Sequence, residues 1–233
     1  MERYTLLHTD EHLLAILEKY DGWMREGKIH YAGKILPVRE AFRSQQWILP
    51  TQQAIQILRN ARTFALTECI CRTHYRRCDT PLETCLLIND MADAWVEASK
   101  AQRISLEQAE EVLRKANVHG LVHQTAYNPE QYIWAICSCC SCCCYRLQIL
   151  RQFGRDDLVV RSDYIAVQEE TRCNDCGLCV SRCIFGARQM VGSELVYQSE
   201  RCFGCGLCVT SCSEDAISLC RRAVFQRRPL EMI

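Results

Sequence analysis

The chain has 233 residues, enough to bury a core as one large domain or two small ones. Lys plus Arg and Asp plus Glu balance at 28 each, so no overall charge favours binding to nucleic acid or to an anionic membrane. No apolar run approaches the ~20 residues that span a bilayer, and the first residues lack the pattern of a secretory signal. We therefore expect a cytoplasmic protein with no membrane span.

Cysteine is the outlier of the composition, with 19 residues. A disulfide framework is disfavoured because no export signal is evident, the count is odd, and many thiols are adjacent or one residue apart, where a strain-free bridge is geometrically poor. Free structural cysteines would scatter along apolar faces, whereas these fall into four tight groups. Metal binding is therefore the main interpretation.

Two helices are predicted before the first cysteine. Asp10 is placed to cap one of them, and Thr51, which follows Pro50, is placed to cap the other. Apolar residues recur at helical spacing along 13–24 and 57–65, so we expect both helices to pack into the core.

The first cysteine group consists of Cys69, Cys71, Cys78 and Cys85. The segment TPLE at 80–83 has the pattern of a helix start, which predicts a short helix that carries Cys85. A further helical stretch is predicted around 91–98. Ser105 and Gln108 form a capping box for another helix, which Gly120 is placed to end in a left-handed turn.

The pattern changes after this helix. Residues 121–136 read as two short strands around Asn128 and Pro129. The second strand runs into a string of six thiols in eight residues: Cys137, Cys139, Cys140, Cys142, Cys143 and Cys144. A cysteine-free, charged stretch follows the string, and we place a domain boundary there.

A duplicated motif lies beyond this boundary. The segment CNDCGLCVSRC recurs as CFGCGLCVTSC at an offset of 29 residues. Both copies have the spacing C-x2-C-x2-C-x3-C, which wraps three thiolates around one corner of a cubane and directs the fourth away from it.

This repeat resembles the bacterial dicluster ferredoxins, which carry two [4Fe-4S] clusters, over roughly residues 160–220. The resemblance implies that one cluster is held by Cys173, Cys176, Cys179 and Cys212, and the other by Cys202, Cys205, Cys208 and Cys183. The family usually has Pro after each fourth cysteine, where Ile184 and Ser213 stand here, so the reduction potentials do not follow from the resemblance. Cys220 matches neither unit, and we expect it to be a packed free thiol.

An extended six-thiol string would send its side chains alternately to opposite faces. Cys137, Cys139 and Cys143 would then face one side, and Cys140, Cys142 and Cys144 the other. The first group would complete both faces, because the two groups supply ten thiols together. We expect them to hold one or two additional clusters, either [4Fe-4S] or an unusual larger one. A helical string would group the thiols differently without changing the number of ligands.

Zinc or a two-metal thiolate cluster is the competing interpretation for these ten thiols, since thiolates also suit Zn²⁺ and Cu⁺. Iron–sulfur is preferred because a zinc site has no redox chemistry, so the ferredoxin-like module would have no nearby centre to which it could pass electrons. His74, His119 and His123 lie near these cysteines, but surface or hydrogen-bonded histidines are the commoner outcome.

The predicted fold class is α+β. We expect a mainly helical cysteine-rich domain with a short β-hairpin at 1–152, a dicluster ferredoxin domain at 160–220, and a basic tail at 221–233. The tail carries Arg221, Arg222, Arg227 and Arg228, a candidate docking patch.

The favoured function is an electron carrier or an electron-transfer subunit of an oxidoreductase, relaying low-potential electrons between partner redox proteins. The chain has no G-x-G-x-x-G for a dinucleotide and no P-loop for ATP, so electrons should come from partners. Thiolate-bound cubanes decay in air, which suggests an anaerobic or strongly reducing setting.

Two alternatives remain. One is a reductase whose active site is an unusual N-terminal cluster fed by the ferredoxin domain. The other is a redox-sensing regulator, because residues 105–136 read as helix, turn and two strands, like the start of a winged-helix DNA reader. The helix LEQAEEVLRKANV carries three glutamates and only two cations, which is poor chemistry for a DNA groove, so we expect no nucleic-acid partner.

Overall fold

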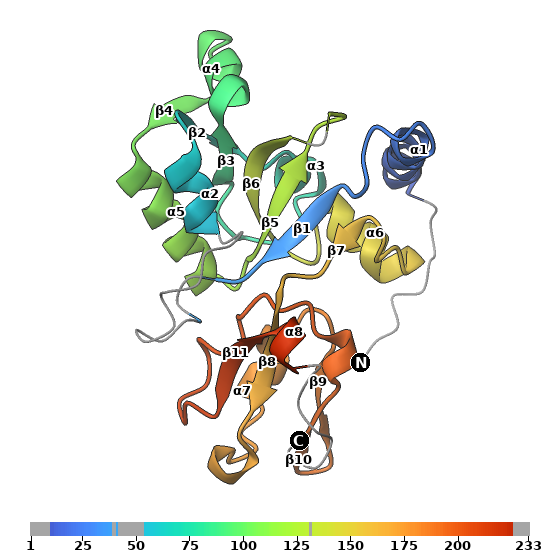
Figure 1. Ribbon diagram of the computed structural model, residues 1–233, viewed down its shortest axis with the longest axis vertical. Coiled ribbons are helices and arrows are strands. Elements are labelled where there is room, and N and C mark those ends of the chain that lie inside the picture. The colour runs from blue at the N-terminus through green and yellow to red at the C-terminus, as the bar shows by residue number, and fades with distance from the viewer. Residues whose placement is uncertain (1–9, 39–40, 42–53, 131, 226–233) are drawn as a thin grey trace.

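Figure 1 shows the computed structural model of the protein, which describes residues 10–38, 41, 54–130 and 132–225. Its largest element is a seven-stranded sheet with the order β4-β2-β3-β6-β5-β1-β7. All neighbouring strands in it run antiparallel except β1 and β7, which are parallel. In chain order, the strands are β1 (Gly33–Leu36), β2 (Phe64–Glu68), β3 (Glu83–Ile88), β4 (Gln102–Ile104), β5 (Val122–Tyr127), β6 (Ile133–Cys139) and β7 (Val159–Val160).

Helices cover both faces of this sheet because its central strands are apolar on both sides. Leu86 and Ile136 pack with α2 (Ala54–Asn60) and α5 (Leu106–Val118) on one face. The next residue on β3, Leu87, packs with α4 (Asn89–Glu97) on the other face, as period-2 alternation requires. A short helix, α3 (Ile70–Tyr75), follows β2.

Two more helices pack against each other near the β1–β7 end of the sheet (Figure 1). They are α1 (Glu11–Arg25) and α6 (Tyr145–Phe153), and their shared core contains Leu13, Ile149 and Leu158. Helix α6 begins directly after the six-thiol string, so this packing fixes where the string ends.

The C-terminal part lies below the large sheet in Figure 1 and contains two two-stranded ribbons. β8 (Tyr164–Gln168) pairs with β11 (Ile217–Arg221), and β9 (Arg188–Val191) pairs with β10 (Glu194–Tyr197). The remaining elements are the 3-10 turns at Glu170–Arg172 and Ser199–Arg201 and the short helices α7 (Leu178–Arg182) and α8 (Arg222–Phe225).

One hydrophobic core joins the two parts. It includes Ile35, Val122 and Leu147 from the sheet region and Leu207 and Leu219 from the C-terminal part. A backbone hydrogen bond crosses the same junction, from Val38 N–H to the Cys205 carbonyl at 2.8 Å. The domain boundary expected between residues 152 and 160 stays a prediction. Strand β7 lies at the C-terminal end of that range.

Several sequence predictions are confirmed. The fold is α+β, Asp10 accepts a hydrogen bond from Leu13 N–H at the start of α1, and Ser105 with Gln108 forms a capping box on α5. Gly120 has a φ of 72°, as predicted for a left-handed turn after α5. The strands around Asn128 and Pro129 are β5 and β6. Pro50 and Thr51 lie outside the described residues.

The expectation that only a short hairpin accompanies the N-terminal helices is wrong, because that hairpin belongs to a seven-stranded sheet. The segment at 80–83 does not start a helix, and Cys85 lies on strand β3. Phe64 and Ala65 belong to β2 rather than to the preceding helix, which ends at Asn60. In each case a short apolar run fits helix and strand equally well, and pairing with neighbouring strands decides the outcome.

The hairpin does not resemble the free wing of a DNA reader. β5 and β6 lie inside the sheet, between β1 and β3, and residues 122–126 of β5 are buried. Among the described helices, none is both long and apolar enough to cross a membrane.

Candidate metal centres

The duplicated motif folds as two copies of the same loop. Left-handed backbone conformations recur at the repeat offset: Asp175 and Gly204 have φ of 54° and 70°, and Gly177 and Gly206 have φ of 73° and 81°. A 3-10 turn precedes the first cysteine of each loop. These shared turns curl each C-x2-C-x2-C segment around a centre, as the spacing predicts.

A cavity lies inside the first loop. Its lining includes four cysteines, namely Cys173, Cys176, Cys179 and Cys212. The fourth of these comes from the second copy of the motif, so a residue distant in sequence joins the first loop. Four thiols around one cavity fit a [4Fe-4S] cluster, whose irons each take one thiolate.

The second loop is more deeply buried. Cys202, Cys205 and Cys208 are all buried, and Cys183 from the first copy is half-buried. Burial raises the pKa of Cys208 to about 12, and the nearby Cys202 and Cys183 sulfurs contribute to the rise. Cys212 thus lies at the cavity of the first loop, and Cys183 lies near Cys208 of the second loop. The exchange of fourth cysteines that the ferredoxin resemblance implies stays a prediction.

A buried arginine lies between the two sets. Arg188, on β9, is only 2% exposed, and its Nη1 lies 4.0 Å from the Cys179 sulfur and 2.5 Å from Gln168 Oε1. The positive charge of Arg188 also lowers the pKa of Cys208, against the larger effect of burial. One cation thus contacts a cysteine of each set.

The six-thiol string is not extended throughout. Strand β6 ends at Cys139, a turn follows, and α6 begins after Cys144. The predicted alternation, with Cys137, Cys139 and Cys143 facing one side, is therefore wrong. The ten N-terminal thiols divide into a group of four and a group of six.

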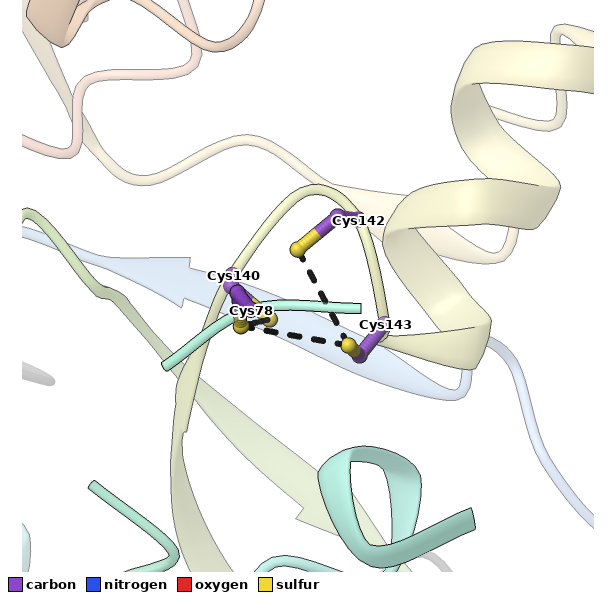
Figure 2. Close-up of side chains that lie close together, drawn as sticks. All are labelled: Cys78, Cys140, Cys142 and Cys143. Atoms are coloured by element: carbon purple, nitrogen blue, oxygen red, sulfur yellow. Dashed lines mark hydrogen bonds between the residues drawn. The ribbon is translucent and has the colours of Figure 1, made fainter. Parts of the chain in front are cut away.

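Figure 2 shows the group of four, formed by Cys78, Cys140, Cys142 and Cys143. All four sulfurs lie within 4.8 Å of one another. The Cys78 sulfur is 3.6 Å from that of Cys140 and 3.9 Å from that of Cys143, and the Cys142 and Cys143 sulfurs are 3.8 Å apart. We call this set the four-sulfur group.

The turn that carries three of these cysteines is held by side chains from other elements. Gln148 donates to the Cys143 carbonyl at 3.0 Å, and Arg77 donates to the Cys142 carbonyl at 3.3 Å. Arg77 also donates to Gln148 Oε1 at 2.7 Å, which links the two supports. These hydrogen bonds hold the turn against α6 and the loop that carries Arg77.

The other six cysteines form a second set, which we call the six-sulfur group: Cys69, Cys71, Cys85, Cys137, Cys139 and Cys144. Strand register brings Cys85 opposite Cys137, with their sulfurs 3.9 Å apart. Thiols of Cys139 and Cys85 lower the pKa of Cys137, and thiols of Cys139 and Cys71 lower that of Cys144. Cys71 in turn lowers the pKa of Cys69, so neighbouring sulfurs connect all six.

Backbone and cationic groups surround the six-sulfur group. Cys69 and Cys144 occupy the N-cap positions of α3 and α6, where the helix dipole favours a thiolate. Arg146 donates to the Cys137 sulfur and Gln124 Nε2 to the Cys144 sulfur, both at 3.3 Å. Such donors stabilise negative charge on sulfur, which fits an iron–sulfur cluster.

A third buried arginine, Arg72, lies beside both groups. Arg72 is 1% exposed, donates to the Ser138 carbonyl at 2.9 Å, and also hydrogen-bonds to the Thr84 hydroxyl. The charges of Cys69 and Cys140, one from each group, raise its pKa, although burial opposes them. The sequence does not single out Arg72, Arg146 and Arg188, because their only signal in it is that they lie within a few residues of cysteines.

The three histidines have other partners. His74 stacks on His12 with ring centroids 4.2 Å apart, and His119 is the C-cap of α5. His123 is buried, with Nδ1 3.0 Å from the Ser138 hydroxyl, and burial lowers its pKa to about 4. No described histidine belongs to the four-sulfur group.

One of the tail arginines, Arg222, has hydrogen-bond partners within the fold. Arg222 donates to the carbonyls of Ser162 and Cys202 at 2.8 and 2.6 Å, which joins α8 to the second loop. Arg227 and Arg228 lie outside the described residues. Cys220 is half-buried on β11.

Comparison with known proteins places an iron–sulfur binding region in the C-terminal part. The family Fer4, described as a 4Fe-4S binding domain, matches residues 195–218, which contain four cysteines of the second motif. No curated protein and no solved structure matches the chain. The chain thus carries a ferredoxin-type iron–sulfur region. The four-sulfur group is a further set of cysteines that could hold a metal ion.

Proposed function

We propose that the protein is an iron–sulfur electron-transfer protein or subunit. Two ferredoxin-type [4Fe-4S] clusters and at least one further cluster in the N-terminal part relay low-potential electrons between partner redox proteins. The protein works in the cytoplasm of an anaerobic or strongly reducing cell, and its partners belong to an oxidoreductase system rather than to nucleic acid.

The cavity of the first loop carries the proposal. Cys173, Cys176 and Cys179 lie around it with Cys212, which is 33 residues beyond Cys179 in the sequence. A chance set of packed thiols would not need a ligand from the other copy of the motif. The exchange of fourth cysteines is the arrangement by which duplicated C-x2-C-x2-C-x3-C units hold two cubanes.

The common core supports a relay rather than separate sites. Cys139 and Cys144 of the six-sulfur group pack in the same hydrophobic cluster as Cys179, Cys202, Cys205 and Cys208. Iron–sulfur clusters do one-electron chemistry, and clusters held in one continuous core are placed to exchange electrons. The N-terminal cluster would then be one end of the relay.

A redox titration of the full chain tests this function. Anaerobically purified protein is reduced stepwise and followed by electron paramagnetic resonance. We expect at least three paramagnetic centres, two of which disappear when Cys179→Ser and Cys208→Ser are combined. An absence of any centre reducible at low potential would contradict the proposed relay.

A reductase is the second candidate, because the six-sulfur group has more thiols than one cubane binds. A group of aromatic and imidazole rings lies next to it. His12 Nε2 is 3.0 Å from the Tyr145 hydroxyl. Burial is the main cause that raises the pKa of Tyr145 to about 12, and the Cys71 and Cys69 sulfurs add to the rise. These groups could move protons beside a cluster that supplies electrons.

Substrate-dependent oxidation of the reduced protein tests the reductase. Under this function, a substrate should reoxidise the reduced chain without a partner protein, and Tyr145→Phe should slow that reaction while leaving the iron content unchanged. Reoxidation only by protein partners favours the electron carrier.

A further inference from the structure

The sulfur spacing of the four-sulfur group differs from that of the ferredoxin-type sets. In the part of the chain that the structure describes, it is the one set of cysteine, histidine, aspartate or glutamate side chains whose ligand atoms all lie within 4.8 Å of one another. The first ferredoxin-type set instead surrounds a cavity. Because both sets lie in one molecule, the difference in their sulfur spacing comes from the local fold around each set.

A single tetrahedral metal ion explains the short distances. Four thiolates at about 2.3 Å from one zinc ion lie about 3.8 Å from one another. Three sulfur pairs of the four-sulfur group are separated by 3.6, 3.8 and 3.9 Å, and all pairs lie within 4.8 Å. In a cubane, each thiolate binds a different iron at a separate corner, which holds the sulfurs farther apart.

The surroundings of the four-sulfur group match a closed site. Cys140 and Cys143 are buried among Ala116 and Leu121, and the Thr80 hydroxyl lies 3.1 Å from the Cys78 sulfur. Four thiolates around a divalent ion leave a net charge of about −2. Arg77, which holds the turn, brings a positive charge to it.

We propose that Cys78, Cys140, Cys142 and Cys143 bind one divalent thiophilic metal ion, Zn²⁺ or Fe²⁺, in a closed tetrathiolate site. The ion ties the loop before β3 to the turn after β6. Because Cys69 and Cys71 precede that loop and Cys144 follows that turn, the ion positions ligands of the six-sulfur group. Its role is structural, since four protein sulfurs leave no open coordination position.

Metal and sulfide analysis of a double variant tests the site. Zinc, iron and acid-labile sulfide are measured in anaerobically purified full-length protein, in Cys142→Ser/Cys143→Ser, and in Cys220→Ser as a matched control. We expect the double variant to lose one zinc or iron ion per chain and no sulfide relative to the wild type. The control should lose neither.

X-ray absorption of the wild type gives a readout that does not depend on the variant folding. If the ion is zinc, the extended fine structure beyond the zinc edge should show four sulfur neighbours at about 2.3 Å and no short metal–metal distance. If the ion is iron, Mössbauer spectra should contain one mononuclear site per chain beside the cluster iron. These two outcomes distinguish the metals, and either one supports the site.

Loss of iron and sulfide together from the double variant, with wild-type spectra that contain only cluster iron, would overturn the proposal. This result is distinct from failure of the electron-transfer function. A wild-type protein that contains zinc but no sulfide would refute the relay and leave the tetrathiolate site standing.

Discussion

Arg146 and Arg188 are buried arginines that lie against cysteine sulfurs, one in each part of the molecule. Arg146 donates to the Cys137 sulfur at 3.3 Å, and Arg188 lies between Cys179 and Cys208. Burying a guanidinium is costly unless negative charge or hydrogen-bond acceptors offset its lost hydration. Under the proposed function, thiolate-bound clusters would supply that negative charge, so each arginine would stabilise a cluster and be stabilised by it.

Arg188→Met should lower the reduction potentials of both ferredoxin-type clusters. Removing the positive charge destabilises the reduced, more negative state, and a lost charge-assisted contact of about 1.5 kcal/mol corresponds to roughly 65 mV for a one-electron couple. Arg188→Lys keeps the charge and should shift the potentials less. The measurement is an anaerobic redox titration with iron content as a control, and unchanged potentials in the methionine variant would contradict this role.

Gly204→Ala should prevent the second loop from holding its cluster. Gly204 has a φ of 70°, and an added Cβ would clash with the Tyr164 carbonyl oxygen and the Ser162 hydroxyl. The matched control is Gly192→Ala, which has a φ of 62° and meets nothing within 4 Å.

We expect the control to cost only the left-handed penalty of about 1–2 kcal/mol and to keep its iron. Gly204→Ala should lose about four iron per chain, the content of one cubane. Equal iron content and equal thermal stability in the two variants would show that the close approach of β8 does not constrain this loop.

Elements differ in how well the sequence predicts them. The helix from Leu106 to Val118 has its own cap, stripe and terminator, so local chemistry specifies it. Strand β3 has no such signal, because ETCLLI is a short apolar run that becomes a strand only by pairing with β2 and β6. The ferredoxin-type cysteines are predicted from the repeat and its resemblance to dicluster ferredoxins, whereas the division of the other ten thiols depends on where β6 ends and α6 begins.

Ser105→Ala should destabilise α5 without changing metal content. The side chain of Ser105 accepts a hydrogen bond from Gln108 N–H at 3.2 Å, and losing such a cap costs about 1 kcal/mol. The check is a lower thermal midpoint under anaerobic conditions with wild-type iron and sulfide. A loss of iron would mean that α5 supports the cysteine groups more directly than its position on the sheet indicates.

Across the whole molecule, a shared core couples two parts that the sequence presents as separate modules. Leu147 and Val122 pack in the same cluster as Leu207 and Phe203. Arg182 adds a link by donating to the Asn117 carbonyl at 2.8 Å. A substitution that destabilises one part can therefore destabilise the other through the shared core, even where their metal ligands are distinct.

Cys176→Ala tests how far that coupling extends. Cys176 is exposed and lines the cavity of the first loop, so the substitution removes a predicted ligand with little loss of packing. We expect the loss of one cubane, about four iron per chain, with the N-terminal metal retained. Loss of all iron would instead mean that both parts fold as one unit around their clusters.

The most direct test of the account is the iron and acid-labile sulfide content of the anaerobically purified full chain. Two ferredoxin-type clusters alone give about eight iron per chain, and a cluster in the six-sulfur group raises the number clearly above that. We predict a brown protein with more than eight iron and comparable sulfide. A fully folded, colourless protein without iron would contradict the account.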